Sequence, residues 1–136
     1  MPRTSLQSKL RVARGLGSAK SGVGHWWAQR LTAIALAPLC IWFAGSILAA
    51  ARADDPFRIA DWLGSPVAAL AMITFLVALF WHAKLGMQVV IEDYVHSPRA
   101  KYTLLIANAF LCFGVTAAGV LAVLRLHMFD LVAGGA

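Results

Sequence analysis

Three long apolar windows constrain this chain more than any other feature of its sequence. Residues 31–51 and 102–124 contain no charged side chain, and residues 63–91 contain only Lys84 as a formal charge. A helix that crosses a bilayer needs about 20 predominantly apolar residues. Inside lipid, only helices and closed barrels satisfy every backbone hydrogen-bonding group. The sequence therefore predicts an all-α integral membrane protein with three transmembrane helices.

The apolar windows also divide the chain into regions. We expect helices at about residues 27–51, 66–94 and 100–126. Residues 26–126 then form a three-helix membrane domain, preceded by a basic cytoplasmic segment, residues 1–25, and followed by a short periplasmic tail, residues 127–136. Too few residues remain outside the membrane to build a soluble catalytic core.

Glycine, proline and small residues mark the expected helix ends and contacts. Gly22 and Gly24 are expected to break the chain before the first helix, and Pro98 to close the second helix. Residues 59–63 are expected to form a short interfacial turn, and Pro38 predicts a kink in the first helix. The third helix carries four small residues that suit close helix packing: Gly114, Ala117, Ala118 and Gly119.

The charged residues indicate an orientation and exclude one class of partner. Only 13% of the residues are charged, against roughly 25% in soluble domains, and the net charge is +6. The basic residues before the first helix are Arg3, Lys9, Arg11, Arg14 and Lys20, and Asp54 is the first acid. Basic flanks mark cytoplasmic helix ends, so we expect a cytoplasmic N-terminus, a periplasmic C-terminus and a lipid bilayer, rather than nucleic acid, as the partner.

The expected compartment is the bacterial inner membrane. The residues before the first helix lack the apolar run of a signal peptide. A basic leader without acids is also typical of mitochondrial targeting, so the mitochondrial inner membrane is the alternative.

One polar face runs through the middle of the second helix. On a helix that turns about 100° per residue, four residues fall within roughly 60° of one another: His82, Gly86, Val89 and Asp93. At about 1.5 Å per residue, His82 lies roughly 16 Å from Tyr94, near the bilayer midplane if Tyr94 marks the boundary. Such an imidazole bonds another helix, relays protons, or ligates a metal or tetrapyrrole.

The neighbours of His82 bear on these alternatives. Gly86 leaves room for a flat macrocycle and favours ligation, whereas a proton relay would need further ionisable groups at the same depth. A six-coordinate haem would need its other axial ligand from a partner chain, because His82 is the only histidine placed deep in the membrane. Lys84 points to the opposite side, where it snorkels, pairs with a partner's acid or approaches a buried anion, and we favour snorkelling.

The expected cytoplasmic end of the second helix carries a second candidate site. Tyr94 either belongs to the aromatic belt or donates its phenol proton to a quinone carbonyl, with Asp93 orienting an arginine or a water beside it. Arg30 either snorkels or reaches an acidic or ketonic group of a ligand. Because Arg30 and Tyr94 are expected at similar depth on neighbouring helices, a shared pocket is possible.

Two motifs resemble a known family. The first helix opens with His25-Trp-Trp-Ala-Gln-Arg-Leu-Thr-Ala-Ile-Ala-Leu36, and the second carries His82-Ala-Lys-Leu-Gly-Met and ends with Glu-Asp-Tyr-Val95. Together with the three spans, they resemble the small hydrophobic membrane-anchor subunit of succinate dehydrogenase, respiratory complex II. The resemblance implies that His82 is an axial ligand of the iron of a b-type haem and that Tyr94 donates to ubiquinone. It also implies that Asp93 and Arg30 line or support the quinone and haem-propionate region.

The resemblance extends to partners and function. It implies a cytochrome b-type subunit that supplies the other haem histidine, and an iron–sulfur subunit and a flavoprotein subunit on the N-terminal face. The chain itself would be a non-catalytic anchor that links the tricarboxylic acid cycle to the quinone pool. Lys84 departs from the family pattern, and no role carries over to His25. A fumarate reductase anchor, a non-redox membrane module with a structural His82, and a pigment-binding antenna chain are the alternatives.

Overall fold

The computed structural model describes residues 22–52 and 58–133, and every element in these ranges is a helix. The elements are α2 (Gly22–Ala51), α3 (Arg58–Gly64), α4 (Pro66–Tyr94) and α5 (Pro98–Ala133). In α2, α4 and the part of α5 up to Phe129, the described chain has three helices long and apolar enough to cross a membrane. The prediction of an all-α, three-span membrane protein is confirmed. The basic segment before residue 22 lies outside the described residues.

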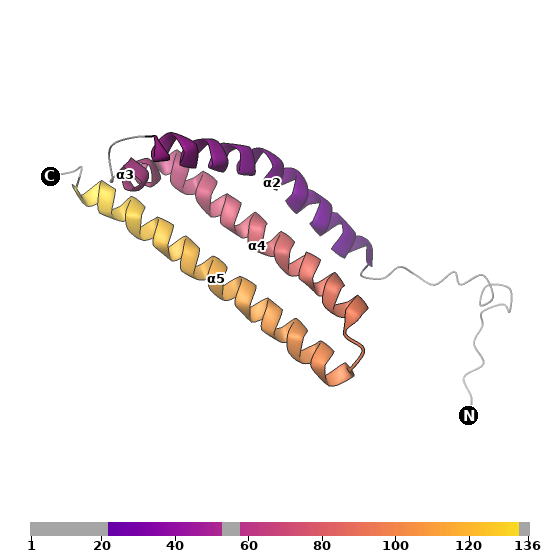
Figure 1. The fold of residues 1–136 in the computed structure, drawn as a ribbon. Helices are drawn as coiled ribbons and strands as arrows, with labels where there is room; N and C mark the ends of the chain where they lie inside the picture. The colour runs from indigo at the N-terminus through magenta and orange to yellow at the C-terminus, as the bar shows by residue number, and fades with distance from the viewer. Residues whose placement is uncertain (1–21, 53–57, 134–136) are drawn as a thin grey trace, which may run out of the picture.

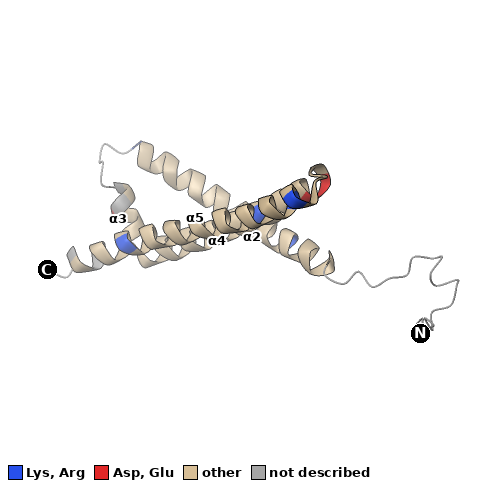
Figure 2. Ribbon diagram, turned by 90° about the horizontal axis from the view of Figure 1, so that it is seen from below, with Lys and Arg blue, Asp and Glu red and all other residues tan. Residues whose placement is uncertain are grey.

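The three long helices form one layer with α4 in the middle (Figure 1), in which α2 crosses α4 obliquely (Figure 2). The start of α2, the end of α4 and the start of α5 lie at one end of the layer, and α3 lies at the other. In the described residues, α2 and α5 contact α4 and α3 but not each other. Helix α4 is therefore the element against which the others are positioned.

Two helices are longer than expected. Gly22 and Gly24 lie inside α2, so the prediction that they break the chain was wrong. Glycine disfavours a helix by only about 1 kcal/mol, and the apolar helix that follows overrides this preference. Helix α5 extends beyond Leu126, because the next helix-breaking residue in the sequence is Gly134.

The prolines occupy positions that suit their chemistry. Helix α4 ends at Tyr94, and Pro98 is the first residue of α5, where the missing N–H costs no hydrogen bond. Pro66 has the same place in α4, and the Ser65 hydroxyl accepts a hydrogen bond from the Ala68 N–H at 3.3 Å. Helix α2 continues through Pro38 and is bowed over α4 (Figure 1).

The apolar core lies toward the α3 end of the layer. Its buried residues are Leu36, Leu63, Ala69, Met72, Phe75, Ala78 and Val123. Phe43 of α2 stacks on Phe75 of α4, with 4.9 Å between ring centroids, and Trp42 lies 5.1 Å from Trp62 of α3. Residues 59–63, expected as an interfacial turn, are part of α3, which packs against all three long helices. The α3 end is therefore the closed end of the molecule.

Helices α4 and α5 approach closely at Gly119. A Cβ atom added at Gly119 would lie 3.0 Å from Leu76 Cδ1, whereas one added at Gly114 would have no heavy atom within 4 Å. Nearer the other end, Asn108 Nδ2 of α5 donates to the Lys84 backbone carbonyl at 3.0 Å. The predicted close packing of small residues is confirmed for Gly119, while Gly114 is exposed in this chain.

Replacing Gly119 by valine should destabilise the α4–α5 contact. The added methyl groups would overlap Leu76, and overpacking of this kind costs about 1–3 kcal/mol. The measurement is the thermal unfolding midpoint of the purified protein in detergent. Gly114→Val is the matched control, since it makes the same change of residue in open space. Equal midpoints for the two variants would show that the Gly119 contact does not limit stability.

Candidate functional site

Helix α2 presents a polar stripe to α4. His25, Gln29 and Thr32 are spaced i, i+4 and i+7, so they share one face of α2. The structure sets this stripe against the face of α4 that carries His82 and Gly86. The α4 face was predicted from its spacing. The α2 stripe was missed, although the same test of helical spacing identifies it.

A hydrogen bond near the middle of both helices joins the α2 stripe to the His82 face of α4. His82 Nδ1 lies 2.9 Å from Thr32 Oγ1, and the Thr32 hydroxyl also donates to the Ala28 carbonyl at 2.8 Å. The His82 side chain is half-buried. The interpretation that His82 bonds a neighbouring helix is therefore confirmed. Because imidazole has a second ring nitrogen, this bond does not exclude ligation through Nε2.

A metal at His82 would need ligands from another molecule. Within residues 22–52 and 58–133, no group of three or more His, Cys, Asp or Glu side chains could hold a metal ion. A tetrapyrrole fits this donor set, since its macrocycle supplies four nitrogens and leaves only axial positions to the protein.

Gln29 lies over Gly86, one turn from the Thr32–His82 contact. A Cβ added at Gly86 would lie 3.7 Å from Gln29 Nε2, which is an ordinary contact distance. Gln29 Oε1 and His25 Nε2 are buried and have no hydrogen-bond partner among the described residues. Buried polar atoms without partners are costly, so these two call for a water or a neighbouring molecule.

A polar cavity continues this stripe to the end of the layer. It has a volume of about 380 Å³ and is lined by Gly22, His25, Gln88, Val89 and Glu92. Gln88 Nε2 donates to Glu92 Oε1 at 2.8 Å on its wall. The cavity combines an imidazole, an amide and a carboxylate, which is a donor and acceptor set for a polar ligand group or ordered water.

The residues predicted for the quinone region lie outside this cavity. Tyr94 is 78% exposed, and Asp93 and Arg30 are exposed as well. The Arg30 guanidinium lies 5.4 Å from the centroid of the Trp26 ring. None of these three side chains lines the cavities described in this section. Because Tyr94 is so exposed, a second molecule can reach its side chain.

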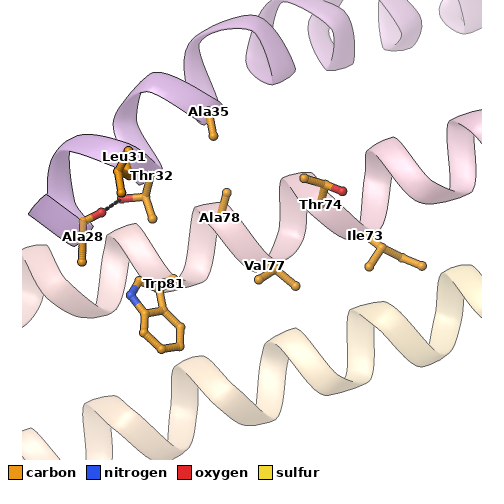
Figure 3. Close-up of a pocket in the computed structure, with 9 residues that line it drawn as sticks. All are labelled: Ala28, Leu31, Thr32, Ala35, Ile73, Thr74, Val77, Ala78 and Trp81. Carbon is orange, nitrogen blue, oxygen red and sulfur yellow. Dashed lines mark hydrogen bonds between the residues drawn. The ribbon is translucent and has the colours of Figure 1, made fainter.

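An apolar cavity of about 530 Å³ lies between α2 and α4 (Figure 3). It is lined by Ala28, Leu31, Thr32, Ala35, Ile73, Thr74, Val77, Ala78 and Trp81. Figure 3 shows Thr32 and Trp81 near one end, with the Thr32 hydroxyl bonded to the Ala28 carbonyl. Apart from the two threonines and the indole N–H of Trp81, this lining is apolar, which suits a lipid tail or the ring of a cofactor.

Lys84 occupies a smaller cavity between α4 and α5. Its Nζ lies 5.4 Å from the Trp81 ring centroid and 5.5 Å from that of Phe113, in a space of about 220 Å³. Trp81 lies three residues farther from the Tyr94 end, so the ammonium does not extend toward that end. Cation–π contact with both rings stabilises the ammonium at this position, and the snorkelling interpretation stays a prediction.

Comparison with known proteins places the chain in a family. Residues 4–116 match the family described as succinate dehydrogenase/fumarate reductase transmembrane subunit. The succinate dehydrogenase hydrophobic membrane anchor subunit of Rickettsia bellii is 38% identical over 102 residues, 74% of this chain and 80% of that protein. The proteins of the same name from Rickettsia conorii and Paracoccus denitrificans are 36% identical over 116 residues and 30% identical over 122 residues. These alignments cover 85% and 90% of this chain, and 92% and 93% of the relatives.

No solved structure matches the chain significantly. The match to the family description covers most of the chain, including α2, α4 and the first half of α5. The chain belongs to the succinate dehydrogenase/fumarate reductase transmembrane subunit family.

Proposed function

We propose that this chain is the hydrophobic membrane anchor subunit of a succinate:ubiquinone oxidoreductase in a bacterial inner membrane. The observation that carries the proposal is the family match over residues 4–116, together with relatives named as anchor subunits. As an anchor the chain is non-catalytic. It holds the flavoprotein and iron–sulfur subunits at the membrane and pairs with a cytochrome b-type subunit.

The charge distribution supports a docking end for the soluble subunits. Figure 2 shows acidic and basic residues close together where α4 ends and α5 begins. Lys101 Nζ donates to the Glu92 carbonyl at 2.8 Å there. The N-terminus of α2 lies at the same end, so the basic residues 1–20 precede this surface. The rule that basic flanks stay inside assigns this end to the cytoplasm.

His82 is the proposed axial ligand of haem b. When bound, haem supplies an iron that accepts an imidazole nitrogen and changes between two oxidation states. His82 fits this role because its Nδ1 is engaged with Thr32, which leaves Nε2 for a metal, and because Thr32 also lines an apolar cavity. A histidine of the partner cytochrome b-type subunit would hold the iron together with His82.

Tyr94 is the proposed quinone contact. Its exposed phenol can donate a hydrogen bond to a carbonyl oxygen of ubiquinone in a pocket completed by the partner subunits. Asp93 and Arg30 support this region: each places a charged side chain that can form hydrogen bonds near the quinone carbonyl and the haem propionates. The chain's own contribution is therefore to position ubiquinone, the electron acceptor, while the electrons arrive from the iron–sulfur subunit.

The assembly is tested by purifying the complex gently through a tag on this chain. Mass identification should find flavoprotein, iron–sulfur and cytochrome b subunits, and a reduced-minus-oxidised spectrum should show a b-type haem band. Long-wavelength pigment absorption, or neither haem nor these partners, would contradict the proposal. The relative rates of succinate oxidation and fumarate reduction would separate the two activities in the family description.

Tyr94→Phe should slow quinone reduction by roughly two- to tenfold, because it removes a hydrogen bond of about 0.5–1.5 kcal/mol. Subunit assembly and succinate oxidation with an artificial acceptor should not change. The measurement is the steady-state rate with each acceptor. Tyr102→Phe is the matched control, since Tyr102 is also exposed and lies near the start of α5. Unchanged quinone reduction in Tyr94→Phe would remove Tyr94 from the site.

His82→Ala should abolish or shift the b-type haem band, because the iron loses an axial nitrogen. The visible difference spectrum of the purified complex measures this change. His96→Ala provides a comparison, since His96 is exposed and its Nδ1 contacts only the backbone carbonyl of Tyr94 in the described chain. A normal haem band in His82→Ala would leave His82 as a structural residue.

A further inference from the structure

The hydroxyl of Thr32 has more polar neighbours than it has protons. Thr32 Oγ1 lies 2.8 Å from the Ala28 carbonyl oxygen, 3.1 Å from the Gln29 carbonyl oxygen and 2.9 Å from His82 Nδ1. A hydroxyl donates one proton and accepts through its lone pairs, whereas a carbonyl oxygen only accepts. The close contact with Ala28 is therefore a hydrogen bond only if the hydroxyl proton points to the helix backbone.

This assignment fixes the proton on the imidazole. With its own proton directed at Ala28, Thr32 Oγ1 can only accept from His82, so Nδ1 must carry a hydrogen. The opposite tautomer would turn the hydroxyl proton toward Nδ1. Two oxygen atoms would then face each other at 2.8 Å without a proton between them, and one of the two hydrogen bonds would be lost.

The backbone of α2 makes this arrangement stiff. Threonine is β-branched, and inside a helix its hydroxyl bonds readily to the carbonyl four residues earlier. The Oγ1 position is thus set by α2 before α4 packs against it. Since the bond crosses between helices, it also limits rotation of the His82 ring.

We propose that Thr32 is a positioning residue that holds His82 in the Nδ1–H tautomer and presents the Nε2 lone pair to a metal. The inference rests on the proposed function, in which that metal is the iron of haem b. A ligating histidine generally donates its other N–H to an acceptor that fixes the ring and raises its basicity. Here the acceptor is a neutral hydroxyl that is itself held by the backbone.

Thr74 offers a matched control in the same chain. It lies on α4, its hydroxyl donates to the Leu70 carbonyl at 2.8 Å, and it lines the same apolar cavity as Thr32 (Figure 3). It has no hydrogen bond to an imidazole in the described residues. A change from threonine to valine therefore removes the same backbone contact at both positions, but only at Thr32 does it release a histidine.

The experiment compares Thr32→Val, Thr32→Ser and Thr74→Val in the whole purified complex. The readouts are the haem midpoint potential and the electron paramagnetic resonance spectrum of the ferric haem. Thr32→Val should raise the potential and shift the ferric signal, because an imidazole without an acceptor stabilises ferric iron less. Thr32→Ser should restore both values toward those of the unmodified protein, and Thr74→Val should match the unmodified protein.

The outcomes separate this inference from the function on which it rests. If Thr32→Val does not assemble, Thr32→Ala tests the same loss of the hydroxyl with a smaller side chain. If the variant without the Thr32 hydroxyl has the same haem potential and ferric signal as Thr74→Val, Thr32 does not position His82. Haem loss in His82→Ala would then still support ligation by His82. A normal haem in His82→Ala would overturn both.

Discussion

A polar side chain in the apolar interior of a membrane must find its partner inside protein, and this constraint explains three contacts between the long helices. Thr32 joins α2 to His82, Asn108 joins α5 to the Lys84 backbone, and the Lys84 ammonium contacts the rings of Trp81 and Phe113. Each contact reaches from one helix to another, and α4 takes part in all of them. The central position of α4 therefore follows from where its polar groups occur.

The molecule is closed at one end and open at the other. Around α3, the core and the stacked aromatic rings fill the space between helices. Toward the Tyr94 end there are instead a polar cavity, buried atoms of His25 and Gln29 without partners in the described chain, and an exposed tyrosine. Large apolar side chains also cover the outer faces. These features suit a subunit whose remaining contacts are made by lipid and by other chains.

The apolar windows were sufficient to predict the three spans, and helical spacing was sufficient to identify the face of His82. The start of α2 was misplaced because the helix-breaking tendency of glycine is weak. The end of α5 was misplaced because no glycine or proline lies between Leu126 and Gly134. The position of Lys84 depends on Phe113, which is distant in sequence, so it could not be predicted from one helix. The pairing of Thr32 with His82 depends on the register between α2 and α4. Haem, quinone and partner subunits stay proposals that rest on the family.

The separation of α2 from α5 has a consequence for the insertion of the chain into the membrane, because α2 is made before α4 and α5. Because α2 contacts no long helix except α4, its polar stripe has no partner on another described helix that spans the membrane while α2 is the only span. Thr32 can satisfy itself during that interval through the Ala28 carbonyl. Gln29 has no such bond in the described structure, since its Oε1 is without a partner even after α4 has packed. His25 Nε2 is in the same position, so the newly inserted first span exposes two polar side chains that need early shielding, and α4 provides only part of it.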